Sequence, residues 1–231
     1  MSDADPSPAG PSAVPLRGAA ALPGAALTAA VKARYATLAS TCGSLSCGAA
    51  LDLAAPRPGE TVVDLGCGRG RDVVRSAELV GAGGLAIGVD LSEEMLDEAG
   101  RRTALRTNVR LVRSVMAPLE LAAGIADAVV SNCAINHAPD KEAVFREIHR
   151  VLRRGGRFVV SDVVAERELP ESVRGDPAAW AACYGGAIPE ADYLAAARRA
   201  GFGRLDVLHR SEPYDKGGVR VLSLTLRGDK P

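Results

Sequence analysis

Residues 62–70 read VVDLGCGRG, an apolar run that ends in an acid and then in three glycines at alternate positions. The apolar run predicts a buried parallel strand, and the glycines predict a tight turn where the backbone can approach a ligand closely. A second apolar run, residues 85–89, ends directly before Asp90. A carboxylate at the end of a second strand can accept hydrogen bonds from both ribose hydroxyls of a nucleoside. These two strand ends therefore predict a nucleoside site at the carboxyl edge of an α/β sheet.

Short strands and amphipathic helices alternate along the middle of the chain. Strands are predicted at Thr61–Leu65, Leu85–Val89, Val109–Arg113, Ala128–Ser131 and Arg157–Ser161. A helix is predicted over 141–152, with Asp140 as its N-cap. Gly155 or Gly156 is expected to end that helix in a left-handed conformation. Ser92 is expected to cap an earlier helix. This alternation of strands and helices predicts a Rossmann-like, doubly wound α/β sheet that is mostly parallel.

The first part of the chain departs from this alternation. Residues 1–25 consist mostly of Ala, Pro, Gly and Ser. They are predicted to be disordered, because they bury too little apolar surface to offset the entropy of ordering. Helices are predicted over 27–40 and near 48–54 from the spacing of apolar residues. One domain is expected to span residues 26–231.

The last part of the chain predicts an antiparallel addition to the sheet. A helix is predicted at 192–201, followed by strands at 205–208 and 219–226 with a polar loop between them. These two strands are predicted to form an antiparallel pair at one edge of the sheet.

Composition excludes several classes of function. The 231 residues carry 28 basic and 28 acidic side chains, so no excess of positive charge is present to bind a nucleic-acid backbone. No apolar run approaches the roughly 20 residues that span a bilayer, and no secretory signal is recognisable. The five cysteines are an odd number in a chain large enough to fold without disulfides. They predict reduced thiols and a cytoplasmic location, with no nucleic-acid or membrane partner.

Two cysteines stand in distinctive surroundings. Residues 131–141 read SNCAINHAPDK and place Cys133 at the carboxyl end of the fourth predicted strand, where substrates meet cofactors in such sheets. Residues 180–187 read WAACYGGA and contain Cys183. This second segment belongs to an insertion after the fifth strand, about residues 163–192, which is expected to fold back as a lid.

The spacing G-x-G-x-G after an acidic strand end resembles the class I S-adenosylmethionine-dependent methyltransferases, and the resemblance covers about residues 60–226. It implies that S-adenosylmethionine is the cofactor. It further implies that Asp64 and Gly66 hold the amino-acid end, that Asp90 holds the ribose, and that residues 114–116 frame the adenine. The complete cofactor set implied by the resemblance is Asp64, Gly66, Gly68, Asp90, Leu91, Val115, Met116 and Asn132. Many relatives have an acid at the position of Val115, so backbone groups and Met116 are expected to hold the adenine here.

The two cysteine segments, together with GRGRD at 68–72 and SDV at 161–163, resemble arsenite methyltransferases. This resemblance implies that Cys133 and Cys183 bind trivalent arsenic as thiolates, with Cys47 or Cys42 as the third thiol. Soft sulfur ligands suit such a soft centre. The arsenic lone pair can attack a sulfonium methyl group in line, without a general base. The resemblance also implies a trivalent arsenical substrate and a thiol reductant such as glutathione or thioredoxin.

The chain departs from the arsenite methyltransferase pattern at three places. Val73 stands where many members have a further cysteine. Cys42 and Cys47 are five residues apart, whereas the corresponding cysteines of the family are adjacent. The sequence given also ends soon after the last predicted strand, so the further C-terminal domain of many family members is not expected in it.

Two other functions remain open from the residues. One is methylation of an organic oxygen, nitrogen or carbon acceptor, which needs a base near Asn136–His137. The other is thiol-based binding of a metalloid without catalysis. A buried cysteine is also often a small apolar residue of the core. Packing is the role expected for Cys67, whereas His137 is expected to line the mouth of the sheet.

Overall fold

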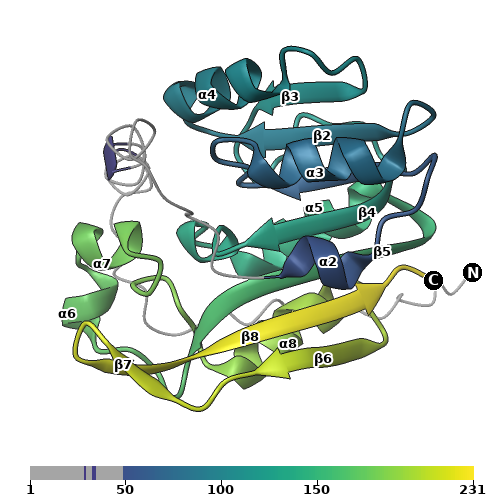
Figure 1. Cartoon of the computed structure of the whole chain (residues 1–231). Helices are drawn as coiled ribbons and strands as arrows, with labels where there is room; N and C mark the ends of the chain where they lie inside the picture. The colour runs from purple at the N-terminus through teal and green to yellow at the C-terminus, as the bar shows by residue number, and fades with distance from the viewer. Residues whose placement is uncertain (1–28, 30–32, 35–48) are drawn as a thin grey trace, which may run out of the picture.

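The computed structural model describes residues 29, 33, 34 and 49–231 (Figure 1). Three sequence predictions fall wholly or mostly outside these residues: the disordered segment 1–25, the helix 27–40, and the thiols of Cys42 and Cys47. Within the described part of the chain, no helix has the length and apolar character needed to cross a membrane.

One mixed sheet forms the centre of the described domain (Figure 1). Its strand order is β3-β2-β1-β4-β5-β8-β6, and β7 pairs with β8. The strands are β1 Thr61–Leu65, β2 Leu85–Asp90, β3 Val109–Arg113, β4 Ala126–Asn132, β5 Leu152–Ala165, β6 Leu205–Arg210, β7 Tyr214–Lys216 and β8 Val219–Asp229. The first five strands pair in parallel, and the later ones pair antiparallel. The predicted Rossmann-like α/β fold is confirmed.

Helices cover both faces of the sheet, which explains why the central parallel strands β1 and β2 are mostly apolar. One face carries α2 (Ala50–Ala54), α3 (Arg71–Val80) and α4 (Glu93–Thr103). The other carries α5 (Lys141–Val151) and α8 (Glu190–Arg199). Four aromatic side chains pack between α5, α8 and the sheet, with Phe158 4.6 Å from Phe202 between ring centroids and Phe145 5.3 Å from Tyr193. This aromatic group fixes α8 against the sheet.

The helix starts follow the predicted caps. The Ser92 hydroxyl accepts a hydrogen bond from the Met95 N–H, and the Asp140 carboxylate accepts one from the Ala143 N–H. The predicted glycine end of α5 is wrong, because the helix ends at Val151: Leu152 is already extended and pairs with Ala126 of β4. Gly155 does have the predicted left-handed conformation, with φ +73°, but it lies in a bulge of β5, and regular pairing with β4 resumes at Arg157.

The C-terminal strands form the predicted antiparallel pair at one edge of the sheet: β8 lies between β5 and β6 and is antiparallel to both. They differ from the prediction in one way, because the stretch predicted as a polar loop contains β7, which forms a hairpin with β8 through Gly217 and Gly218. Both glycines have left-handed φ values, +59° and +79°, as a two-residue type I′ turn requires.

β5 and β8 continue beyond the end of β4 as a paired arm, and β7 pairs with β8 at the far end of this arm. The pairing of β4 with β5 ends at Asn132 opposite Ser161, whereas β5 and β8 remain paired as far as Ala165 and Val221. Residues 166–189 then carry α6 (Glu171–Arg174) and α7 (Pro177–Ala181) before α8 begins. The segment predicted as a lid is thus attached to the end of this arm.

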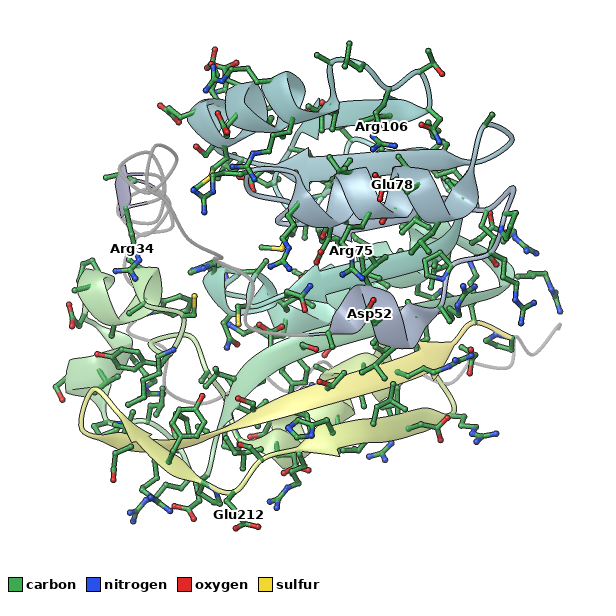
Figure 2. All side chains as sticks on the ribbon, in the orientation of Figure 1. Arg34, Asp52, Arg75, Glu78, Arg106 and Glu212 are labelled. Carbon is green, nitrogen blue, oxygen red and sulfur yellow. The ribbon has the colours of Figure 1, made fainter. Side chains whose placement is uncertain are left out.

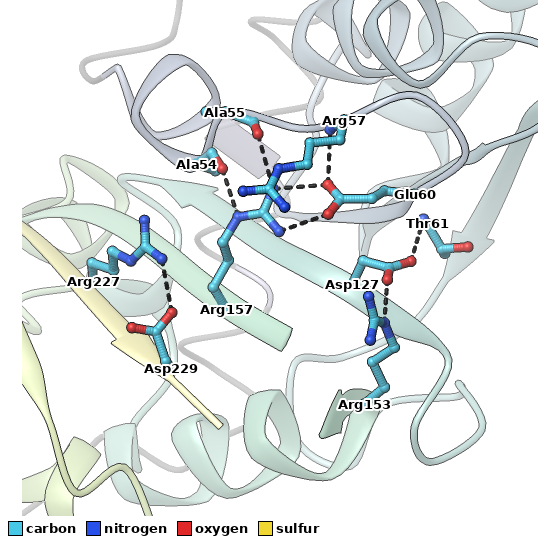
Figure 3. Close-up of polar contacts among 10 residues, drawn as sticks. All are labelled: Ala54, Ala55, Arg57, Glu60, Thr61, Asp127, Arg153, Arg157, Arg227 and Asp229. Carbon is cyan, nitrogen blue, oxygen red and sulfur yellow. Dashed lines mark hydrogen bonds and ion pairs between the residues drawn. The ribbon is translucent and has the colours of Figure 1, made fainter. Parts of the chain in front are cut away.

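Arginine contacts fix α2 to the sheet. The Arg157 guanidinium donates hydrogen bonds to the carbonyls of Ala54 and Ala55, at 2.6 and 3.0 Å, and pairs with both oxygens of the Glu60 carboxylate (Figure 3). On the outer side of α2, Asp52 faces Arg75 of α3 at 2.5 Å (Figure 2). The short helix α2 therefore owes its position to these contacts as well as to its apolar side chains.

Candidate active site

The glycine-rich loop, residues 66–70, packs against the segment that follows β4. The Gly66 N–H donates to the Val89 carbonyl at 2.8 Å. Gly66 has a left-handed φ of +71°, and a Cβ at this position would collide with the Cβ of Ala134. Glycine is therefore required for the first turn of the loop to approach the end of β4 this closely.

Asp90 lies at the end of β2, as predicted, and its carboxylate holds the loop. One oxygen accepts the Gly68 N–H and the other accepts the Ser92 N–H, both at 2.9 Å. Burial raises the pKa of Asp90, and hydrogen bonds from the backbone of Ser92, Gly68 and Leu91 oppose this shift. Each carboxylate oxygen can accept a further hydrogen bond, so the group retains the capacity to bind a ribose diol.

Asp64 is a buried acid at the end of β1, with 5% of its surface exposed. No hydrogen bond to its carboxylate comes from the residues that the structure describes. Burial raises the pKa of Asp64 well above its usual value, and the charges of Asp72 and Asp90 raise it further. Three carboxylates this close favour a positively charged ligand, which fits the ammonium and sulfonium groups of S-adenosylmethionine.

The other predicted cofactor residues surround this group. Leu91 is half-buried and Val115 is exposed, whereas Met116 packs against the apolar core. The Asn132 side chain is engaged by protein groups: it donates to Asp72 at 3.0 Å and accepts the Ala50 N–H at 3.3 Å. Asn132 therefore joins α2 and α3 to the end of β4.

Cys133 follows β4 at the carboxyl edge of the sheet. Its N–H donates to the Ser161 carbonyl at 2.8 Å, and its side chain is buried. Its φ of +56° is left-handed, a conformation that costs free energy for a residue with a side chain. A short 3-10 helix, Ile135–His137, follows directly.

Cys183 follows α7 in the predicted lid and shares this unusual conformation, with φ +68°. Its carbonyl accepts a hydrogen bond from the Asn136 side-chain amide at 3.1 Å, and its Sγ lies 3.4 Å from Nε2 of His137. The structure therefore brings the Cys183 segment into contact with the turn that follows Cys133. Among the described residues no metal-binding group of three His, Cys, Asp or Glu side chains occurs, and the predicted third thiol lies outside them.

His137 is held in its neutral form beside Cys183. Burial lowers the pKa of His137 to about 4, and the positive charge of Lys141 acts in the same direction. Arg34 and Lys216 add smaller effects of the same sign, and a weak polar contact with the Trp180 backbone opposes them. A neutral imidazole nitrogen near the Cys183 sulfur can accept the thiol proton in a hydrogen bond.

Residues 56–211 match a protein family described as "Methyltransferase domain". This chain belongs to that family. The expectation of an S-adenosylmethionine-dependent methyltransferase resembling the arsenite enzymes is confirmed, and so is S-adenosylmethionine as its cofactor.

Two curated relatives are arsenite methyltransferases. That of Halobacterium salinarum is 39% identical over 81% of this chain and 51% of its own length. That of Aquipseudomonas alcaligenes is 42% identical over 61% of this chain and 43% of its own length. This methyltransferase domain thus spans about half the length of these relatives or less.

A solved structure with the same fold is the arsenic(III) S-adenosylmethionine methyltransferase of Chlamydomonas reinhardtii. It is 32% identical, with a TM-score of 0.69, and the match covers 87% of this chain and 73% of that one.

Removing the Asp90 carboxylate should weaken cofactor binding. We expect Asp90→Ala to reduce the affinity for S-adenosylhomocysteine about 10- to 100-fold, because a buried charge-assisted hydrogen bond contributes about 1.5–3 kcal/mol. Calorimetry on the methyltransferase domain measures this directly. Asp97→Ala, on the exposed side of α4, is the matched control and should bind normally. Equal affinity in both variants would contradict the assignment of Asp90 to the ribose.

Burial of neutral His137 should make the domain sensitive to acid. Below pH 6.5 the unfolded chain takes up a proton at His137, whereas the folded domain does so only near pH 4. Stability is therefore lost as the pH falls through this window. Between pH 7 and 4.5, we expect the wild type to lose about 2 kcal/mol more than His137→Leu in urea unfolding. His209→Leu, at an exposed position, should follow the wild type; a His137→Leu profile that does the same contradicts the prediction.

The contacts of three side chains at the site were not predicted: those of Asn136, Lys141 and Trp180. One signal for Lys141 was present in the sequence. A lysine directly after an N-cap lies at the positive end of a helix, where a basic side chain is unfavourable. Such a residue is better explained by a tertiary contact than by the stability of the helix.

Proposed function

We propose that this domain transfers a methyl group from S-adenosylmethionine to trivalent arsenic held by the thiolates of Cys133 and Cys183. The observation that supports this most directly is the contact between the two cysteine segments. Cys183 meets the turn after Cys133 through both its carbonyl and its sulfur. Both cysteines also have left-handed backbone conformations, which concentrate at functional sites. We choose arsenic over other soft acceptors because these relatives are named arsenite methyltransferases.

Thiol exchange loads the substrate. Each thiol replaces one hydroxide of arsenite, so an S–As bond forms, an As–O bond breaks, and the thiol proton leaves with the hydroxide as water. Neutral His137 can accept a hydrogen bond from the Cys183 thiol before this exchange, because its nitrogen lies 3.4 Å from the sulfur. Cys47 or Cys42 is proposed as the third thiol, which would complete a pyramidal set of sulfur ligands.

Orientation and exclusion of water are the main tasks of the protein. S-adenosylmethionine, when bound, supplies an electrophilic methyl group. Asp64 and Asp90 hold the charged and ribose parts of the cofactor, and the cysteines fix the arsenic lone pair toward it. Such alignment of two reactants contributes roughly 7–11 kcal/mol in favourable systems. We further propose that the lid, about residues 163–192, closes over the carboxyl edge of the sheet to keep water out.

A thiol reductant is a proposed partner. Methylation leaves arsenic formally pentavalent, and its return to the trivalent state requires two electrons. Thiols supply these electrons as they form a disulfide, which glutathione or thioredoxin can then reduce. A reducing, cytoplasmic location agrees with this requirement, because the cysteines must start as thiols.

The test is a reaction of purified protein with arsenite, S-adenosylmethionine and glutathione. Methylated arsenicals and S-adenosylhomocysteine, separated by liquid chromatography, should appear together. Arsenic binding without S-adenosylhomocysteine would instead identify a sequestering protein. Turnover of an organic acceptor, with none of arsenite, would identify a different methyltransferase.

A further inference from the structure

Lys141 is a buried lysine in an unfavourable place. Only 4% of its surface is exposed, and it occupies the first turn of α5, where the helix dipole disfavours a positive charge. Burial lowers the pKa of Lys141 to about 7, and the charges of Asp162 and Asp140 oppose this shift. Neither burial nor helix position explains a lysine here, so its role must come from its contacts.

The Lys141 ammonium contacts both cysteine segments. Nζ donates to the carbonyl of Asn136 at 3.2 Å and to that of Ala138 at 2.6 Å, both in the turn after Cys133. It also lies 5.0 Å from the ring centroid of Trp180 on α7, within the range of a cation–π interaction. One side chain therefore joins the turn to the lid.

Asn136 forms a second link beside the first. Its side-chain amide donates to the Val163 carbonyl at 2.6 Å and to the Cys183 carbonyl at 3.1 Å. Gly186 fills the remaining space so closely that a Cβ there would collide with the Asn136 carbonyl and the Trp180 ring. Trp180, Gly186 and the Asn136 carbonyl are therefore tightly packed beside the Lys141 contact.

We propose that Lys141 is a positioning residue that locks the lid onto the turn after Cys133, so that the sulfurs of Cys133 and Cys183 face the same arsenic. The identity of the bound atom rests on the proposed function. The lock itself does not, because it consists of protein contacts alone.

Trp180 reports the state of this lock, since it is the only tryptophan of the chain. Lys141→Met keeps the length of the side chain and removes its charge and donors. We expect the acrylamide quenching constant of Trp180 to rise about threefold in this variant. Lys216→Met is the matched control: its charge also acts on His137, but the described residues give it no hydrogen bond to the lid. A normal quenching constant in Lys141→Met, or equal changes in both variants, would overturn the proposal.

Binding of phenylarsine oxide, which links two nearby thiols, tests the consequence for the cysteines. Lys141→Met should weaken this binding about 10- to 100-fold, whereas the affinity for S-adenosylhomocysteine should stay within twofold of the wild type. A merely destabilised domain would lose both. Unchanged phenylarsine oxide binding would refute a role in positioning the sulfurs.

These experiments also distinguish failure of the proposed function from failure of the variant to fold. If wild-type protein binds no phenylarsine oxide and methylates no arsenite, the proposed function fails, and Trp180 quenching still decides whether the lock exists. If circular dichroism shows that Lys141→Met does not fold, Trp180→Leu removes the lock from the lid side. That variant should lose phenylarsine oxide binding to the same extent, and normal binding would overturn the proposal.

Discussion

Replacing Cys133 or Cys183 with serine should lower the formation of methylated arsenicals at least 100-fold. A serine hydroxyl is a hard ligand that stays protonated at neutral pH, so it cannot replace a thiolate on a soft centre. Loss of one sulfur also leaves the arsenic lone pair without a fixed direction. Alignment of two reactants contributes several kcal/mol to catalysis, and this contribution would be lost. Product formation per enzyme, measured with saturating S-adenosylmethionine, gives the size of the loss.

Cys67→Ala provides the control for this experiment. Cys67 is a buried free thiol packed beside Val73 and Ala86, as predicted, and lies outside the contact between the two cysteine segments. Its removal should leave most of the activity, and the two serine variants should bind S-adenosylhomocysteine normally. Wild-type turnover in one serine variant would exclude that thiol as a ligand. Wild-type turnover in both would exclude arsenic bound by this pair.

Replacing Arg157 with glutamine should destabilise the domain by about 3–5 kcal/mol, because it leaves two carbonyls of the α2 end without their donor and leaves the half-buried Glu60 carboxylate with only the Arg57 N–H. Arg157 and Glu60 have side chains only 11% and 12% exposed. The free energy of unfolding in urea, measured at neutral pH, is the appropriate readout.

Arg227→Gln is the matched change in an exposed ion pair, which Figure 3 shows close to the first. Arg227 and Asp229 are 34% and 42% exposed, so this change should cost no more than about 1 kcal/mol. Adding Glu60→Gln to Arg157→Gln should restore part of the lost stability, since no buried charge then remains unpaired. Equal effects of the two arginine changes would show that burial does not determine the strength of these pairs.

The parallel half of the fold was predictable because each strand carries its own signal. Two strands have the predicted bounds, Thr61–Leu65 and Val109–Arg113. Their apolar runs are short and lie between helices, so the sequence determines where each strand begins and ends. The α5–β5 junction was not predictable. Glycines at 155 and 156 suggest a helix end, but pairing with β4 draws Leu152 into the sheet first. Strand pairing therefore set the end of α5, although the local sequence indicated a later end.

Part of the candidate site was likewise predictable from the sequence, and part was not. The positions of Asp64, Asp90 and Cys133 at strand ends follow from the order of strands along the chain, which the sequence reveals. The lock does not follow in this way, because Lys141 and Trp180 are far apart in sequence and neither belongs to a strand pattern. Left-handed cysteines are likewise invisible in a sequence, where glycine is the usual sign of that conformation.

The overhang of β5 and β8 has a mechanical consequence. Backbone hydrogen bonds hold β5 to β8 from Asp162 to Ala165, and β7 pairs with β8 at Val221. The support of β4 ends near Ser161, so the arm should bend there as one stiff unit and carry α6 and α7 with it. We therefore expect slow amide exchange along the paired strands even while substrate enters and leaves.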